Sequence, residues 1–470
     1  MCFFASHWRN NTMRLWHKTM FILTATALSV ATAQADMTAM ERAQKFGISD
    51  IRGIAYIPGP TGPEKPLDPR FGGVLPYFQG EIQTYDKSGN PYYQPDPNNP
   101  RAKLNVKYTI YYDSDFYNAD FRDLWGKDVN KQGRDDLGRY KAELNANFIH
   151  LYDWNTDRRF RNHDPFLKYA KNLGMNVTIP ISNYIYEIMC GSNPDVPQQD
   201  WPKYVKQLFD DIYEGSLNPD PAAGVLKIFN EFDVSQCKRA DLVAQVALYW
   251  KELEDELAVP DRNRLPVIFP VTFGIKHDLA GGAVLDAFNA ILAEPRLGLA
   301  FWKARVIYAT NPFNDGPFMR EWIDHQLPAW FMGHNIPTDT PVMFTEYGRS
   351  SDESSPPNEA GQAAWVKRQF QSMWQPAKPV NFLGACAFVN QYRFWLDAPE
   401  PNFALMDFNR GGGAWNQPAA MYVQTEKYQN PNALIGQKWD ASYQVGPQKP
   451  RPAYCELARV YGAPPSGDCP

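Results

Sequence analysis

The chain has 470 residues, of which 44% are hydrophobic and 14% aromatic, and its formal net charge at pH 7 is −5. This length exceeds one average domain, but a barrel with insertions accommodates it as a single unit. The acidic balance argues against a nucleic-acid partner, which a basic patch would attract, whereas a neutral polysaccharide needs no charge complementarity.

The N-terminal segment has the pattern of an export signal. Basic side chains precede an apolar stretch at residues 20–30, and an A-x-A cleavage site follows at residues 33–35. The apolar stretch is shorter than the roughly 20 residues that span a bilayer. We therefore expect a signal peptide over residues 1–35, cleavage after Ala35, a secreted or periplasmic protein, and no stable membrane insertion.

Eight apolar runs of strand length follow, and helix-like segments separate most of them. This alternation is typical of a parallel α/β architecture, and eight strands are the number that a (β/α)8 TIM barrel needs. We expect this glycosidase-type catalytic domain to cover residues 36–410. The runs lie at residues 51–57, 147–152, 176–181, 225–229, 265–271, 304–309, 341–345 and 381–389. Apolar stripes predict helices at residues 135–145, 164–173, 201–213, 240–257, 283–292, 318–327 and 360–374.

Two segments depart from the alternation. Residues 58–133 form a long insertion after the first strand, and connections of this length are often functional, so we expect part of a cleft wall or a lid. Residues 411–470 are expected to form an irregular C-terminal extension packed on the barrel. The acidic side chains of the insertion match no calcium-loop motif and no cysteine has metal-ligand spacing, so neither a metal nor a cofactor is expected.

Five cysteines remain after removal of the signal. Cys190 and Cys237 both follow strand ends on the same predicted face, which is compatible with a bridge between them. Cys455 and Cys469 are placed to staple the C-terminal extension. Cys386 lies inside an apolar run, which predicts a buried free thiol. The sequence alone leaves the pairing open.

Two glutamates stand at the ends of apolar runs. Glu231 and the preceding Asn230 follow the run at residues 225–229, and Glu346 follows the run at residues 341–345. Side chains at the carboxyl ends of barrel strands face the active site. Two carboxylates delivered there can cleave a glycosidic bond, because one protonates the leaving oxygen while the other attacks the anomeric carbon. We predict Glu231 as acid/base, Glu346 as nucleophile and Asn230 as a ligand of the sugar 2-hydroxyl.

Aromatic and amide side chains near other strand ends are candidates for sugar binding, since a flat ring stacks on a pyranose face. Packing in the core is the competing interpretation for each of these aromatic residues. The predicted substrate-binding set is Tyr56, Tyr152, Trp154, Asn230, Asn311, Tyr347, Tyr392 and Trp395.

Several of these motifs occur together in a known family. They are residues 51–56 (IRGIAY), residues 134–152, Asn230 with Glu231, residues 346–348 (EYG) and residues 402–406 (NFALM). Through them, residues 51–408 resemble clan A glycoside hydrolases, and most closely the family 72 β-1,3-glucanosyltransferases.

The resemblance implies a TIM barrel that acts on β-1,3-glucan, with Tyr152 as a sugar-site tyrosine and with the two glutamates in the roles given above. Two residues depart from the family pattern. Phe229 stands where the family usually has a glycine. Phe313 stands where the family places a tyrosine close to the nucleophile, and a phenylalanine cannot donate a hydrogen bond to it.

We therefore expect an exported, monomeric, retaining β-glycosidase or transglycosidase acting on a β-glucan, with β-1,3 linkage as the first expectation. The same fold and mechanism on a β-1,4-glucan, a mannan or a galactoside stays open, because members of the clan share the catalytic motifs. A non-catalytic carbohydrate-binding envelope protein is a third hypothesis, and the presence of both glutamates counts against it. The chain has no HExxH, P-loop or GxGxxG motif, so a metallohydrolase or a nucleotide enzyme finds no support.

Overall fold

The computed structural model describes residues 37–57, 134–154, 162–193, 196–235, 237–272, 282–391, 400–408, 448–464 and 467–469, with short segments between 81 and 127. The predicted signal peptide, most of the insertion at residues 58–133 and residues 409–447 lie outside the described residues.

Eight parallel strands form one sheet that closes on itself. They are β1 (Ile51–Ala55), β6 (Phe148–His150), β7 (Asn176–Ile181), β8 (Ala223–Ile228), β9 (Val267–Ile268), β10 (Tyr308–Thr310), β11 (Val342–Tyr347) and β12 (Phe382–Ala387). The strand order is β10-β11-β12-β1-β6-β7-β8-β9, so each strand pairs with its predecessor in the barrel and β12 pairs with β1. Parallel bridges Val267↔Val306 and Val271↔Thr310 join the two edges. The predicted (β/α)8 barrel is confirmed, with a strand in each of the eight apolar runs.

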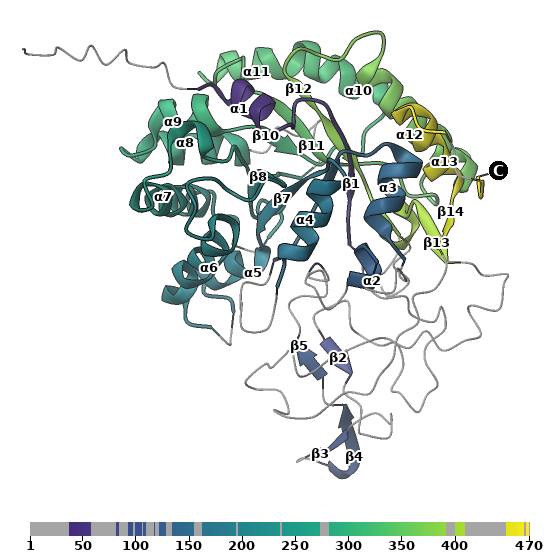
Figure 1. Cartoon of the computed structure of the whole chain (residues 1–470), viewed down its shortest axis with the longest axis horizontal. Helices are drawn as coiled ribbons and strands as arrows, with labels where there is room; N and C mark the ends of the chain where they lie inside the picture. Colours follow the sequence, from purple (N-terminus) through teal and green to yellow (C-terminus); the bar gives the residue numbers. More distant parts are fainter. Residues whose placement is uncertain are drawn as a thin grey trace, which may run out of the picture. The chain divides into compact units, whose positions relative to one another are not determined.

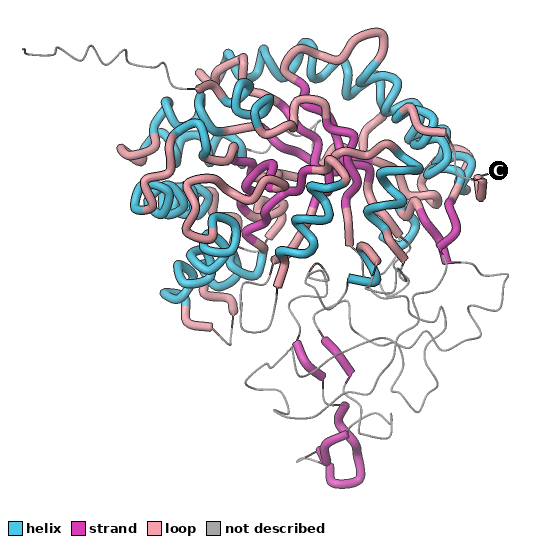
Figure 2. Tube along the Cα trace, viewed as in Figure 1, coloured by secondary structure: helices cyan, strands magenta, loops and turns pink. Residues whose placement is uncertain are grey.

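Helices surround these strands, as Figures 1 and 2 show. Those around the barrel are α1 (Ala39–Lys45), α3 (Asp136–Leu144), α4 (Asp164–Asn172), α5 (Asn183–Cys190), α6 (Trp201–Tyr213), α7 (Asp241–Glu256), α8 (Ala283–Ala293), α9 (Gly298–Arg305), α10 (Gly316–Glu321), α11 (Leu327–Gly333), α12 (Glu359–Trp374) and α13 (Pro452–Tyr461). Each predicted helix is present, although a π-helical turn at Trp322–Gln326 follows α10 and leads into α11. Helices α1, α5, α9, α11 and α13 were not predicted. The apolar residues of α5 directly follow those of β7, and α9 takes the first two residues of the predicted strand run at 304–309.

Side chains along each strand alternate between two cores, as a pleated strand requires. Outward side chains such as Ile149 and Leu226 pack against the helices in the outer core. Inward side chains such as Phe148 and Val225 fill the barrel, where Ile48 joins them from the loop after α1. Gly384 has φ of 130°, and a Cβ atom there would collide with the backbone of β1, so only glycine allows this pairing of β12 with β1.

The C-terminal extension is not wholly irregular, contrary to the sequence-based expectation. Strand β14 (Gln448–Pro450) pairs antiparallel with β13 (Met406–Phe408), and α13 follows it and packs on α12 and α3. The Tyr461 hydroxyl of α13 donates to the Gly53 carbonyl of β1 at 3.0 Å, and the Cys455–Cys469 disulfide closes the segment. This part of the extension is therefore integral to the barrel wall.

Within the insertion, the structure describes short elements. Strand β2 (Glu81–Gln83) pairs with β5 (Lys107–Thr109), and β3 (Tyr93–Asp96) pairs with β4 (Asn99–Asn105), both antiparallel. Before the short helix α2 (Arg122–Trp125), Tyr117 is buried and its hydroxyl donates to the Tyr56 carbonyl at 2.9 Å. At that point the insertion belongs to the core.

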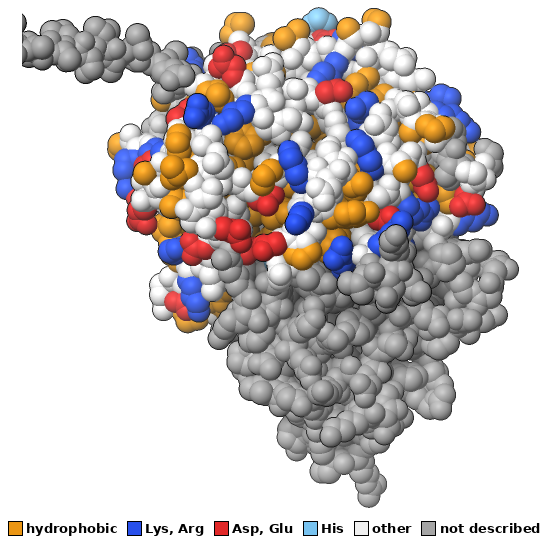
Figure 3. Space-filling view, viewed as in Figure 1, with side chains coloured by type: hydrophobic (Ala, Val, Ile, Leu, Met, Phe, Trp, Pro, Cys, Tyr) orange, Lys and Arg blue, Asp and Glu red, His pale blue; other side chains and the backbone are white. Residues whose placement is uncertain are grey.

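Acidic and basic side chains intermingle on the face of the barrel seen in Figure 3. Among the described residues, no helix combines the length and the apolar character needed to cross a membrane.

Candidate functional site

The strand that carries Glu231 ends in a strained backbone conformation. After β8, Phe229 and Glu231 both adopt left-handed angles, with φ of 59° and 51°, on either side of Asn230. Each such non-glycine residue costs about 1–3 kcal/mol and persists only where its surroundings hold it. The angle at Phe229 also explains why a glycine suits this position in the family pattern, since glycine adopts it freely.

Neighbouring elements hold this turn on both sides. The Asn183 side chain, at the start of α5, accepts from the Asn230 N–H at 2.7 Å and donates to the Asn230 carbonyl at 2.8 Å. The Phe229 N–H donates to the Ile181 carbonyl at the end of β7, and the Glu231 N–H donates to the Pro270 carbonyl just after β9, both at 2.8 Å. The strained turn is thereby fixed, and Glu231 is directed to the carboxyl end of the barrel.

The loop after Glu231 is also tied down. A Cys190–Cys237 disulfide, one of the pairings that the sequence left open, is present and joins this loop to the end of α5. The Thr272 N–H donates to the Asp233 carboxylate at 3.1 Å, and the Thr272 hydroxyl donates to the same group. These links connect the loop to the segments after β7 and β9.

Glu346 owes its orientation to a bulge in β11. The pairing with β12 shifts register between Phe344 and Tyr347, so Thr345 and Glu346 together stand opposite a single residue. A bulge of this kind redirects side chains. The two flanking aromatic rings pack in the outer core, whereas Thr345 and Glu346 contact groups on the inner side. Glu346 is only 5% exposed.

Hydrogen bonds hold both glutamates and link the two strand ends that carry them. Asn311 Nδ2 donates to Glu231 Oε1 at 2.8 Å, and Asn311 Oδ1 accepts from the Thr345 hydroxyl. The Tyr152 hydroxyl donates to Glu346 Oε1 at 2.8 Å. One amide therefore joins the strand ends that carry the glutamates, and each carboxylate has a donor of its own.

A buried lysine lies beneath the carboxylates, and the sequence analysis missed it. Lys227 Nζ stands 3.5 Å from His150 Nε2 and 4.6 Å from the centre of the Tyr152 ring. Burial lowers the pKa of Lys227 to about 7, although attraction to Glu346 opposes that shift. Burial and the nearby lysine also hold the pKa of His150 well below its ordinary value. The sequence could have indicated this lysine, because it lies within an apolar strand, two residues after the inward-facing Val225, and residues two apart face the same side of a strand.

An aromatic cluster borders Tyr152. The Phe313 ring lies 5.7 Å and 5.1 Å from the rings of Phe388 and Phe403, and all three pack near Tyr152. Phe313 has no hydroxyl and packs as an apolar side chain. The tyrosine that donates to Glu346 in this chain is Tyr152, in the segment after β6.

Three predicted substrate-binding residues are not brought to this site. Tyr56 is fully buried and donates to Asp136 Oδ2 at 2.9 Å. Trp154 is 4% exposed, and its indole N–H donates to Asp211 Oδ2 at 2.8 Å. Tyr347 lies on the opposite side of β11 from Glu346, buried against α13. All three are buried in the core of this structure and do not join the hydrogen-bonded group around the two glutamates, and their contact with substrate stays a prediction.

Two other predicted residues, Tyr392 and Trp395, lie outside the described residues.

Cys386 is a buried free thiol as predicted, and burial together with the charge of Glu346 raises its pKa. Over the described part of the chain, no cluster of three or more His, Cys, Asp or Glu side chains is arranged to hold a metal ion.

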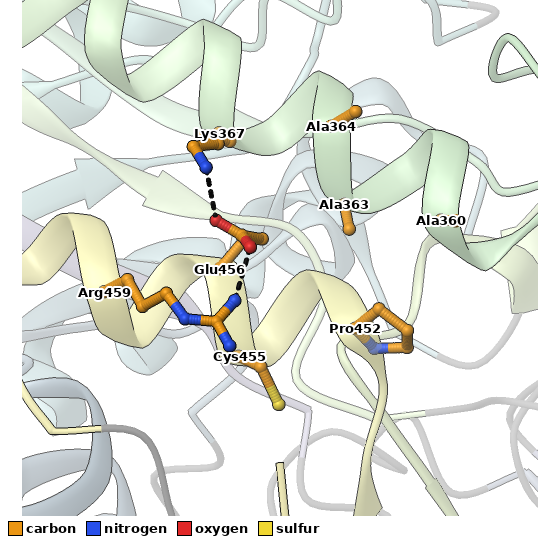
Figure 4. A pocket seen from close by; sticks show the side chains of 8 residues that line it. All are labelled: Ala360, Ala363, Ala364, Lys367, Pro452, Cys455, Glu456 and Arg459. Atoms are coloured by element: carbon orange, nitrogen blue, oxygen red, sulfur yellow. Dashed lines mark hydrogen bonds and ion pairs between the residues drawn. The ribbon is translucent and has the colours of Figure 1, made fainter. Parts of the chain in front are cut away.

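A surface pocket of about 350 Å³ lies away from the two glutamates, between α12 and α13 (Figure 4). Alanine side chains of α12 line one wall. Glu456 of α13 pairs with Lys367 at 3.1 Å and with Arg459, so each charged side chain of this pocket has an ion-pair partner. None of the predicted site residues lines this pocket.

Comparisons with known proteins give only distant likenesses. No protein-family model matches the chain, and no curated protein matches it in sequence. Among solved structures, Gas2 in complex with compound 10 is similar with 13% identity and a TM-score of 0.41, over 69% of this chain and 57% of that one. A mutant of Saccharomyces cerevisiae Gas2p in complex with laminaritetraose and laminaripentaose has 13% identity and a TM-score of 0.39 over the same shares.

A GH2 β-galacturonidase from Eisenbergiella tayi bound to galacturonate is also similar, with 13% identity and a TM-score of 0.39, over 69% of this chain and 46% of that one. This chain thus covers less than two thirds of the length of each of these proteins. Similarity at this level does not extend to activity or substrate.

Proposed function

We propose that the protein is a retaining β-glycoside hydrolase or transglycosidase, with Glu231 as acid/base and Glu346 as nucleophile. The observation that supports this most directly is the convergence of two carboxylates at the carboxyl end of one closed barrel. Asn311 links their strand ends, and donors at 2.8 Å hold both carboxylates. Such a pair at this end of the fold suits glycosidic cleavage by double displacement.

In the first step, Glu231 gives its proton to the glycosidic oxygen while a carboxylate oxygen of Glu346 attacks the anomeric carbon. The bond to the leaving sugar breaks and a glycosyl ester forms on Glu346. In the second step, Glu231 removes a proton from the acceptor hydroxyl, which attacks the anomeric carbon and releases Glu346. Water as acceptor gives hydrolysis, and a sugar hydroxyl gives transfer.

The hydrogen bonds suit these roles. The phenol of Tyr152 donates to Glu346 in its ionised form, as a nucleophile requires, because hydrogen bonds to a carboxylate favour the charged state. The amide of Asn311 orients Glu231 without adding a charge, so the acid can exchange its proton with substrate. The burial of Glu346 excludes most water around the attacking oxygen.

The substrate we propose is a β-glucan, with β-1,3 linkage first, acted on outside the cytoplasm after removal of residues 1–35. The motifs around both glutamates support this choice, as they resemble those of the family 72 enzymes. Other β-linked polysaccharides remain the alternative, to be separated by experiment.

The test is product analysis of the purified protein with laminari-oligosaccharides, followed by mass spectrometry of chain lengths. Products longer than the substrate identify a transglycosidase, and exclusively shorter products identify a hydrolase. Glu346→Gln is expected to abolish both. Glu353→Gln, at a half-exposed glutamate in the loop that follows, is the matched control and is expected to keep full activity.

Absence of products from laminari-oligosaccharides, with turnover of a β-1,4-glucan, mannan or galactoside, would correct the substrate and keep the mechanism. Turnover that survives in Glu346→Gln would contradict the proposed mechanism. Tight oligosaccharide binding without any turnover would favour the non-catalytic hypothesis.

A further inference from the structure

Lys227 is a charge that the stability of the barrel does not require. Its side chain is fully buried, and its direct contacts in the described structure are an imidazole and an aromatic ring. An ammonium taken out of water costs several kcal/mol even after relaxation of its surroundings. An apolar side chain of similar length would fill the same space more favourably, as the residues beneath it do.

The contacts of Lys227 lead to the proposed nucleophile. The ammonium lies over the face of the Tyr152 ring, an arrangement that a cation–π attraction stabilises. The hydroxyl of the same ring donates to Glu346 Oε1 at 2.8 Å. On its other side, Lys227 faces His150 Nε2, and the rings of His150 and Tyr152 meet edge to face with centres 4.9 Å apart. Lys227 and His150 therefore support the tyrosine from beneath.

The charges around Lys227 are three carboxylates. Glu346 on β11 attracts the ammonium most, followed by Asp153 after β6 and by Glu231, which follows Lys227's own strand β8. The Cys386 thiol on β12 also lies nearby, and its raised pKa keeps it uncharged. His150 on β6 opposes a positive charge only if protonated, and burial together with Lys227 keeps it neutral. The net field at Lys227 is that of the carboxylates, and the attraction is mutual.

We propose that Lys227 is a positioning residue for the carboxylate pair: its ammonium holds the Tyr152 phenol against Glu346 and stabilises the ionised form of that glutamate. This role rests on the proposed glycosidase function. Lys227 touches neither the glycosidic oxygen nor the anomeric carbon, and acts through Tyr152 and through its charge.

The experiment compares the pH profile of kcat/KM in the wild-type protein and in Lys227→Met, on the substrate that the product analysis identifies. The acid limb of this profile reports ionisation of the nucleophile in the free enzyme. Without the ammonium, that limb is expected to move to higher pH by about one unit. At the optimum, kcat is expected to fall by about tenfold or more while KM changes little, because misplacement of the attacking group affects the chemical step.

Lys227→Gln keeps a hydrogen-bond donor near His150 and removes the charge, so it is expected to show the same shift if the methionine variant does not fold. Lys378→Met is the matched control: Lys378 is half-buried at the opposite end of the barrel, where Nζ donates to the Ser49 carbonyl. It is expected to keep the wild-type profile.

An acid limb that stays in place in the variants, whatever their kcat, would overturn the role of Lys227 and leave the proposed function standing. Failure of both variants to fold, with Lys378→Met folded, would make Lys227 a folding residue and would also overturn the role. A wild-type protein without turnover that depends on Glu346 would instead overturn the proposed function itself, and the role of Lys227 with it.

Discussion

The barrel interior has two levels that differ in chemistry although the same strands build both. The lower level is apolar, with Phe148, Val225 and Met343 among its members. Two residues further along the same strands, the upper level is polar. It contains His150, Lys227 and Thr345 with its neighbour Glu346, together with Asn311 of the segment after β10.

The difference shows how one fold separates stability from chemistry. Buried methyl and aromatic groups contribute to folding in proportion to the area that they remove from water. Buried polar groups contribute little to folding, and a partly satisfied network destabilises it. A polar upper level is therefore best explained by what it does to a bound molecule, and changes in the two levels should have separate effects.

The largest effect is expected from the proposed reacting groups. Glu346→Gln removes the nucleophile, and turnover is expected to fall by on the order of 10⁴-fold or more. Glu231→Gln removes the acid/base and should cost about 10²–10⁴-fold. The amides match the carboxyls in shape, so circular dichroism and melting temperature should stay near the wild-type values. Wild-type turnover in either variant would remove that glutamate from the mechanism.

A substitution in the apolar lower level is expected to reduce the stability of the fold and to leave turnover unchanged. Phe148→Ala leaves a cavity at the base of the barrel and should reduce the free energy of unfolding by about 3–5 kcal/mol. Denaturant titration measures this loss. Turnover per folded molecule should stay unchanged, because Phe148 packs in the apolar lower level. A large fall in turnover would show that the two levels are coupled.

Asn311→Ala removes the amide that joins the two strand ends. The Glu231 carboxyl and the Thr345 hydroxyl each lose a hydrogen-bond partner, and a hydrogen bond to a charged group is worth about 1.5–3 kcal/mol. We expect kcat/KM to fall by about 10- to 100-fold. A control in the same part of the barrel is Phe313→Leu, which changes an apolar neighbour only. Steady-state kinetics with equal effects in both variants would count against the bridging role.

Tyr152→Phe removes only the hydroxyl that donates to Glu346. The loss of one hydrogen bond to a charged group is worth about 1.5–3 kcal/mol, so kcat should fall by about 10- to 150-fold. The ring and its contact with Lys227 persist in the variant. Unchanged kcat would show that the hydrogen bond does not act in the reaction.

The smallest effect is a difference in melting temperature of a few degrees between the wild type and Lys227→Met. The pKa of Lys227 is about 7 in the folded protein and near 10.5 when exposed, so burial of the charge destabilises the fold at pH 6. Between these two pKa values the unfolded chain binds more protons than the folded protein. The stability of the wild type should therefore rise with pH relative to that of Lys227→Met. Scanning calorimetry from pH 6 to pH 10 would contradict this if the difference stayed constant.

The strands and most helices were predictable because burial on one side or both imposes a period on the sequence. The position of the two glutamates near the carboxyl ends of strands was predictable because each follows an apolar run of the sequence closely, although β11 extends through Glu346. The burial of Tyr56, Trp154 and Tyr347 was not predictable, because sequence position does not reveal which side of the strand end a ring faces. Lys227 was overlooked because it is the one charged residue in the otherwise apolar strand β8. The bulge at Glu346 was not predictable, because it leaves no pattern in the sequence.

The most direct test of the account is to trap the covalent intermediate. A substrate analogue with fluorine at the sugar 2-position and an activated leaving group slows the second step, so the glycosyl ester accumulates. Mass spectrometry of peptides from the labelled protein is predicted to show one adduct, on Glu346, and none in Glu346→Gln. A label on another residue, or turnover of the normal substrate without any adduct, would contradict the assignment of Glu346 as nucleophile.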